Sequence, residues 1–214
     1  MTFRAGESTM GETNRQARAE ATRHQLLEAA RIVFTERGYG ATTVASITDG
    51  ADTAHGTFYL YFRNKEDVFV HVISDVLEEV YQRSLTAIEE AGPEQDLLVL
   101  RQRIAGFLEV VVRYGTLWRA LLEGAMASPV VEEHWLAQRR RFQQAIAGRW
   151  RLRLDGSALD PGLDIDVAAN ALGSMIEWYA VTGAAFGEPQ QLSVDEHVVD
   201  TLTQLWWSAL GRRS

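Results

Sequence analysis

Apolar side chains recur at helical spacing along most of the chain, and no stretch alternates polar and apolar residues as a half-buried strand does. The first clear stripe runs from Leu26 to Phe34. The pair Thr22 and Gln25 before it has the spacing of a helix-capping box, and Gly38 after it is a typical helix end. We therefore predict an all-α fold whose first helix lies between Thr22 and Gly38.

Two short helical patterns and one long pattern follow this first helix. Thr43 is a good N-cap for the first short helix, a break falls near residues 50–53, and the second short helix runs to about Phe62. Asn64 then caps the longer helix. The apolar face of the longer helix contains Phe69, Val70, Ile73, Val76, Leu77 and Val80. Two short helices joined by a tight turn match a helix-turn-helix, whose second helix enters the major groove of DNA.

Prolines mark helix boundaries in the rest of the chain, because proline interrupts helical hydrogen bonding. They are Pro93, Pro129, Pro161 and Pro189. The helical segments that they separate span about residues 94–127, 130–154, 163–186 and 193–210, and the middle segments have room to break again. Residues 1–14 mix Gly, Ser, Thr and Glu without periodicity, and we expect them to form a disordered tail.

The composition fits a soluble globular chain of 214 residues, with 46% hydrophobic and 23% charged residues. The absence of cysteine excludes disulfides, thiol catalysis and cysteine-ligated zinc. No apolar run reaches the roughly 18 residues needed to span a bilayer, so we expect a cytoplasmic protein without a membrane partner.

Charge is unevenly distributed along the chain, whose net charge is −8. Residues 1–66 contain eight basic and eight acidic side chains, and the excess of acid lies in residues 67–214. A strongly basic domain would indicate nucleic-acid binding at once, and this chain does not have one. Residues 53–65 nevertheless carry His55, Arg63 and Lys65 with no acidic side chain among them, which locally favours an anionic partner.

The patterns that indicate enzymes are missing from the sequence. The histidines are His24, His55, His71, His134 and His197, and none forms an H-E-x-x-H or another metal-ligand spacing. There is no G-x-S-x-G, P-loop or G-x-G-x-x-G motif. Asp164 and Asp166 resemble helix-start charges rather than an acid–base pair. We therefore expect no enzyme activity, no catalytic residues, no metal and no cofactor.

The stretch GTFYLYFRNKEDVF, residues 56–69, gathers aromatic rings around Lys65, the only lysine of the chain. A tyrosine can bury its ring and still offer its hydroxyl to a phosphate. Lys65 is expected just inside a helix start, where a cation opposes the helix dipole at a cost of a few tenths of a kcal/mol. An anion docked there would offset that cost, so a helix N-terminus, a lysine and tyrosine hydroxyls together predict a phosphate site.

The segment 22–71 resembles the DNA-binding domain of the tetracycline-repressor (TetR) family of transcriptional regulators. The most specific part of the resemblance is the pattern Gly56-Thr57-Phe58-Tyr59-x-Tyr61-Phe62-x-x-Lys65-Glu66. The resemblance implies a homodimer, a palindromic double-stranded DNA operator, a small-molecule effector and a divergent helical body. It divides the chain into a tail over residues 1–14, a helix-turn-helix domain over residues 15–66, and a ligand-binding and dimerisation domain over residues 67–214.

The resemblance also assigns roles to single residues. The matching DNA contacts are Thr43, Tyr59 and Lys65 for phosphates, His55, Gly56 and Thr57 for bases or adjacent phosphates, and Tyr61 for a position that can face DNA. The chain departs from the family pattern at the turn, where Asp52-Thr53-Ala54-His55 replaces the usual Gly-Val-Ser-Lys. Aspartate can adopt the left-handed conformation that glycine usually supplies there.

The helical body offers candidates for a ligand pocket and a dimer interface. The pocket candidates are Phe107, Trp118, Met126, Trp135, Met175, Trp178 and Tyr179, with ordinary core packing as the alternative. Glu109 and Glu177 lie within apolar runs and are candidates to anchor a cation or a donor, unless each reaches solvent or an arginine. The resemblance places the dimer interface on the last two helices. Its candidate residues are Leu172, Leu202, Leu205 and Trp206, with burial inside one subunit as the alternative.

Together these observations predict a ligand-responsive DNA-binding transcriptional regulator. Repression is the usual mode of the family, so we expect a repressor released from a palindromic operator by a small, largely apolar or aromatic effector. The alternative is a ligand-sensing helical protein without DNA binding.

Overall fold

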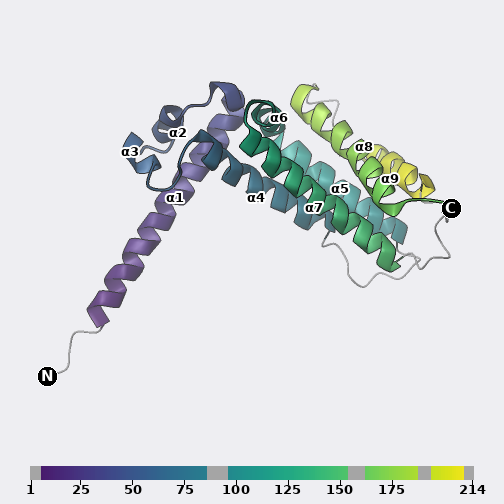
Figure 1. Ribbon diagram of the computed structural model, residues 1–214, viewed down its shortest axis with the longest axis horizontal. Coiled ribbons are helices and arrows are strands. Elements are labelled where there is room, and N and C mark those ends of the chain that lie inside the picture. Colours follow the sequence, from purple (N-terminus) through teal and green to yellow (C-terminus); the bar gives the residue numbers. More distant parts are fainter. Residues whose placement is uncertain (1–5, 86–95, 154–161, 188–193, 210–214) are drawn as a thin grey trace.

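The structure, a computed structural model, describes residues 6–85, 96–153, 162–187 and 194–209, and within these ranges it contains helices and no strand (Figure 1). The helices are α1 (Gly6–Ala41), α2 (Val44–Gly50), α3 (His55–Phe58), α4 (Lys65–Leu85), α5 (Asp96–Tyr114), α6 (Leu117–Ala127), α7 (Pro129–Arg153), α8 (Ile165–Phe186) and α9 (Glu196–Ala209). The predicted all-α fold is confirmed. None of the described helices is long and apolar enough to cross a membrane.

Helix α1 is longer than the sequence patterns predict. It begins at Gly6, and Figure 1 shows its first half projecting away from the other helices. The expected disordered tail over residues 1–14 is therefore corrected for residues 6–14, which are helical. No proline precedes Thr22, so nothing there interrupts helical hydrogen bonding.

The predicted capping box at Thr22 does not form, because the helix continues through it. The Thr22 hydroxyl donates instead to the carbonyl of Arg18, at 3.0 Å within the same helix. Gln25 donates its amide to the carbonyl of Ala51 at 2.7 Å, which ties α1 to the end of α2. The predicted break at Gly38 is present, since Gly38 has a φ of 75° and a non-helical backbone inside α1.

Helices α1, α2 and α3 enclose a small core that the sequence patterns predict well. The fully buried side chains of this core are Leu26, Phe34, Ile47, Phe58 and Phe62. Burial of each such side chain contributes about 1.5–3 kcal/mol of stability relative to exposure. The predicted caps also form. Thr43 accepts a hydrogen bond from the Ser46 N–H at 3.1 Å, and Asn64 accepts one from the Asp67 N–H at 2.8 Å.

The turn between α2 and α3 contains Asp52, with a φ of 48°. Asp52 is the one described non-glycine residue with a positive φ, so it takes the left-handed conformation expected for it. The Thr53 N–H then donates to the Thr48 carbonyl at 3.0 Å. The helix-turn-helix therefore closes without the usual glycine.

Helices α5 to α9 form the body, and α4 runs from the helix-turn-helix along α5 and α7 (Figure 1). Gly115, with a φ of 40°, divides the predicted segment 94–127 into α5 and α6. Pro129 opens α7, where its missing N–H leaves no hydrogen bond unmade. Helix α8 packs on α5, α6 and α7, and α9 packs on α5.

A junction of α1, α4 and α6 joins the two parts of the chain. The carboxylate of Glu123 on α6 accepts a hydrogen bond from the backbone N–H of Tyr39, at 3.0 Å. The hydroxyl of Thr116 donates to the carbonyl of Thr35 at 2.9 Å. Gly124 lies directly against the rings of Tyr39 and Phe69. The end of α1 is thus fixed to α6 by polar and apolar contacts together.

Candidate nucleic-acid interface and ligand pocket

Helix α3 presents a short exposed surface held in place by a buried anchor. Phe58 is fully buried, whereas His55 and Gly56 are exposed and Thr57 is half-buried. Tyr59 is 53% exposed, and its ring contacts the rings of His55 and Phe58 with centroids 5.4 Å apart in each case. The structure thus brings together four of the residues predicted to contact DNA. Their hydroxyl, imidazole and backbone groups can bond to base edges and phosphates.

Thr43 and Tyr61 occupy two different environments near this surface. Thr43 is exposed at the start of α2, with its hydroxyl held by Ser46. Tyr61 is half-buried and packs against the core, so its ring has a structural role whatever its hydroxyl contacts.

Lys65 contacts α1, an arrangement that sequence patterns do not reveal. Its Nζ donates to the carbonyl of Tyr39 at 3.0 Å and lies 4.4 Å from the centre of the Tyr39 ring. A cation above a tyrosine ring is stabilised by about 0.5–2 kcal/mol, depending on its exposure. Lys65 therefore ties the start of α4 to the end of α1. An ammonium has three N–H donors, so this contact leaves donors for a phosphate.

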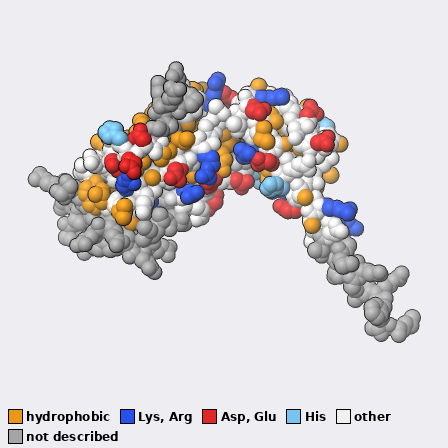
Figure 2. All heavy atoms as spheres, turned by 180° about the vertical axis from the view of Figure 1, so that it is seen from behind, with side chains coloured by type: hydrophobic (Ala, Val, Ile, Leu, Met, Phe, Trp, Pro, Cys, Tyr) orange, Lys and Arg blue, Asp and Glu red, His pale blue; other side chains and the backbone are white. Residues whose placement is uncertain are grey.

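Basic and acidic side chains are interspersed over the face of the molecule in Figure 2, which has no continuous basic patch. Arg63 is exposed and pairs with Asp67 at 3.0 Å, and its hydrogen bond lowers the pKa of the Asp67 carboxyl. The Arg23 guanidinium lies 5.5 Å from the centre of the Phe62 ring. Arg15 and Arg18 are exposed on the projecting part of α1. The acidic partner of Arg63 and the interspersed charges of this face therefore leave no strongly basic surface there.

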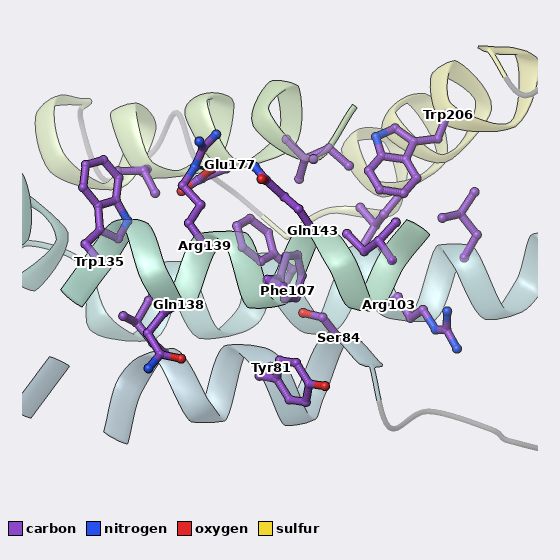
Figure 3. A pocket seen from close by; sticks show the side chains of 18 of the residues that line it. Tyr81, Ser84, Arg103, Phe107, Trp135, Gln138, Arg139, Gln143, Glu177 and Trp206 are labelled. Atoms are coloured by element: carbon purple, nitrogen blue, oxygen red, sulfur yellow. Dashed lines mark hydrogen bonds and ion pairs between the residues drawn. The ribbon is translucent and has the colours of Figure 1, made fainter. Parts of the chain in front are cut away.

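The body contains an apolar cavity of about 110 Å³ between α4, α5, α6, α7, α8 and α9 (Figure 3). Of the predicted pocket residues, Phe107, Trp118 and Trp135 line it. The other aromatic lining residues are Tyr81, Phe142, Trp150 and Trp206, the last of which was predicted at the dimer interface. The spacing of Trp135, Phe142 and Trp150 places them on one face of α7, a periodic signal that indicates this wall.

The other predicted pocket residues lie outside the cavity. They are Met126, Met175, Trp178 and Tyr179, all of them exposed. Met126 is 91% exposed at the end of α6. The remaining three lie on α8 beside Ile176 and Glu177, which face the cavity, and successive helical residues point about 100° apart. Helix α8 is apolar on both sides, so composition alone could not distinguish its inner face.

Two of the predicted interface residues are buried within the chain. Leu202 is buried, and Trp206 is 5% exposed, donating its indole N–H to the Leu172 carbonyl at 3.0 Å. Trp206 also meets the ring of Trp150, so it is a pocket residue. Leu172 is half-buried, and Leu205 is exposed.

The main polar feature of the cavity is an ion pair between Arg139 of α7 and Glu177 of α8, which point toward one another in Figure 3. The Arg139 Nε donates to the carboxylate at 2.5 Å, and a second guanidinium nitrogen donates to the Ser174 hydroxyl at 2.6 Å. Burial raises the pKa of the Glu177 carboxyl, while the Arg139 charge opposes that rise. Glu109, the other predicted acidic anchor, is exposed and does not line the cavity. The described residues contain no cluster of His, Asp and Glu able to hold a metal ion.

Comparison with known proteins gives its strongest sequence matches in the N-terminal unit. Residues 26–72 match the family model of bacterial regulatory proteins of the tetR family. The chain is 38% identical over 68 residues to the uncharacterized HTH-type transcriptional regulator YhgD of Bacillus subtilis (strain 168), which covers 32% of this chain and 36% of the relative. It is 26% identical over 200 residues to the HTH-type transcriptional regulator EthR of Mycolicibacterium smegmatis (strain ATCC 700084 / mc(2)155), which covers 92% and 86%. The chain spans little more than a third of the first curated relatives that it matches.

Solved structures resemble most of the chain. The fatty acid degradation regulator FadR from Bacillus halodurans superposes with a TM-score of 0.74 at 18% identity, covering 90% of this chain and 97% of that one. A complex of SmeT with triclosan superposes with a TM-score of 0.69 at 22% identity, covering 88% and 91%. Because both identities are below 25%, these similarities show a shared fold only. Residues 26–72 therefore match the tetR-family model, and the chain shares the two-part helical fold of solved transcriptional regulators.

Proposed function

We propose that this protein is a homodimeric transcriptional repressor that binds a palindromic operator and leaves it when a small molecule enters the cavity. The observation that carries the proposal is the exposed surface of α3. His55, Gly56, Thr57 and Tyr59 lie there on a three-helix unit with a buried core. Gly56 has no atom within 4 Å of the Cβ position it lacks, which leaves room for a DNA backbone or base edge close to the helix.

The outer face of α8 supports the dimer. Its exposed apolar side chains are Val167, Met175, Trp178, Tyr179 and Phe186, and Leu205 of α9 is also exposed. Large contiguous apolar surfaces are uncommon on monomeric proteins and usually bind a partner. A two-fold dimer uses the same patch on both subunits, so one continuous stripe is sufficient. Two α3 helices related by such an axis would read half-sites about one DNA turn apart, which is why we propose a palindromic operator.

The junction supports release by ligand. Trp118 of α6 lines the cavity, and Glu123 on the same helix holds the backbone of Tyr39. Leu77 and Tyr81 of α4 also line the cavity, and Lys65 at the start of α4 holds the same residue of α1. A ligand that shifts α6 or α4 would therefore shift the helix-turn-helix. Near-complete release requires about 5.5 kcal/mol of preference for the released form.

Removal of a single hydroxyl tests the operator contact. We expect Tyr59→Phe to weaken operator binding at least about tenfold, because a hydrogen bond to a charged phosphate contributes about 1.5–3 kcal/mol. Tyr114→Phe is the control, since it removes a tyrosine hydroxyl that donates to Glu79 on α4, outside α3, the cavity and the outer face of α8. Operator affinity would be measured by titration of fluorescent DNA at fixed salt. Equal affinities of the two variants would remove Tyr59 from the DNA interface.

A further inference from the structure

The cavity walls are dominated by flat rings. Six of them belong to Phe107, Trp118, Trp135, Phe142, Trp150 and Trp206. The indole N–H of Trp118 donates to the Val111 carbonyl at 3.1 Å, and that of Trp206 donates to the Leu172 carbonyl. These two indoles therefore offer ring carbons to a ligand, and their donors are already used. Rings stack on rings in offset or edge-to-face arrangements, so such walls favour an aromatic ligand.

The ion pair inside the cavity disfavours a charged ligand. Arg139 and Glu177 neutralise one another, and their side chains are only 27% and 23% exposed. An anion would compete with Glu177 for Arg139, and a cation would compete with Arg139 for Glu177. Either would leave a buried charge without its partner, which is strongly unfavourable. Arg103 also lines the cavity, but in Figure 3 its guanidinium points away from this pair.

The carboxylate of Glu177 has acceptor capacity beyond the ion pair. The Arg139 Nε bonds to Oε2, and an ionised carboxylate has about four acceptor sites on its two oxygens. A neutral hydroxyl or N–H on the ligand can therefore donate to Glu177 without disturbing Arg139.

The size of the cavity suits a ligand with a single ring. Its volume of about 110 Å³ is of the same order as the roughly 150 Å³ of an engineered cavity known to bind benzene. Building on the proposed function, we propose that the effector is an uncharged single-ring aromatic molecule whose hydroxyl or N–H group donates a hydrogen bond to Glu177.

Single-ring probes that differ in charge and in hydrogen-bond donors test this proposal. The probes are 4-methylphenol, 4-methylanisole, 4-methylbenzoate and phenyltrimethylammonium, titrated into the full chain by calorimetry. Quenching of tryptophan fluorescence gives a second readout, since four of the six tryptophans line the cavity. We expect 4-methylphenol to bind at least about tenfold more tightly than 4-methylanisole, which lacks the donor, and more tightly than either ion.

Variants of Arg139 and Glu177 test the role of the ion pair directly. Glu177→Gln leaves the charge of Arg139 uncompensated and should move the preference to 4-methylbenzoate. Arg139→Gln should move it to phenyltrimethylammonium. Ser174→Ala is the control, because it removes a bond to Arg139 but no charge, and it should keep the wild-type order.

Three results with folded wild-type protein would overturn the proposal: tighter binding of either ion, equal binding of 4-methylphenol and 4-methylanisole, or no binding of any probe. These three results come from wild-type protein, so they test the proposal even if Glu177→Gln fails to fold. The titrations contain no DNA. Selective binding of 4-methylphenol by a chain that never binds an operator would refute the proposed function and leave this inference standing.

Discussion

Gly124 gives the sharpest test of the junction between the helix-turn-helix and the body. A Cβ at this position would lie 2.9 Å from Cε1 of Phe69 and 3.1 Å from Cδ2 of Tyr39. Both rings are almost completely buried. Each is also held on another side, since the Phe69 ring lies 4.4 Å from the Phe34 ring and the Tyr39 ring lies 4.4 Å from Lys65 Nζ. Neither ring has room to yield to an added methyl group.

Two opposing effects determine how much Gly124→Ala changes the free energy of unfolding. Alanine is favoured over glycine inside a helix by about 1 kcal/mol. Overpacking a well-filled core costs about 1–3 kcal/mol. Because both rings are confined, we expect the upper part of that range and a net loss of about 1–2 kcal/mol in the free energy of unfolding. For a chain of this size that loss lowers Tm by about 2–8 °C.

Gly148→Ala is the matched control, because Gly148 lies inside α7 and no atom lies within 4 Å of its added Cβ. There only the helix preference remains, so the free energy of unfolding should rise by about 0.5–1 kcal/mol. Both variants would be compared with wild type by thermal and urea unfolding at one protein concentration, since a dimer's Tm depends on concentration. If Gly124→Ala stabilises the chain as much as Gly148→Ala, the close packing described for the junction is wrong.

Three further predictions follow from the same structure. Thr43→Ala should cost about 1 kcal/mol in urea unfolding because it removes the N-cap of α2, and an unchanged midpoint would argue against that cap. Glu123→Gln should lower the free energy of unfolding by about 1 kcal/mol, because it weakens the hydrogen bond to the Tyr39 N–H. Arg119→Gln is the control and should lower it by less, because it affects only the exposed ion pair with Glu123. Equal losses from the two variants would contradict the role of Glu123 at the junction. Burial and the nearby His71 lower the pKa of His134, so wild type should lose stability as pH falls below about 6.5, and His134→Gln should flatten that profile.

Local signals made the helix-turn-helix predictable from sequence. Gly38, Thr43 and Asn64 act on their immediate neighbours, and each does in the structure what its residue type favours. The left-handed Asp52 is predictable for the same reason. The capping box predicted at Thr22 was wrong. A residue caps a helix only where the helix begins, and α1 continues through Thr22.

The pocket was less predictable, because its residues meet across long distances in the sequence. Trp206 reaches the ring of Trp150 from another helix, and nothing in the local pattern of either residue indicates this contact. Helix α8 carries large apolar residues on both faces, so periodicity could not separate Ile176 inside from Trp178 outside. The contact between Lys65 and Tyr39 likewise depends on how α1 bends at Gly38.

The most direct test of the central claim is selection of bound DNA from a random library by the purified chain, followed by titration of the enriched site at several salt concentrations. The account predicts a two-fold symmetric sequence with half-sites about one helical turn apart. Its affinity should fall with rising salt, with a logarithmic slope of about −0.9 for each phosphate contacted. A folded dimer that enriches no sequence at low salt would contradict the account and leave a ligand-sensing helical protein without DNA binding.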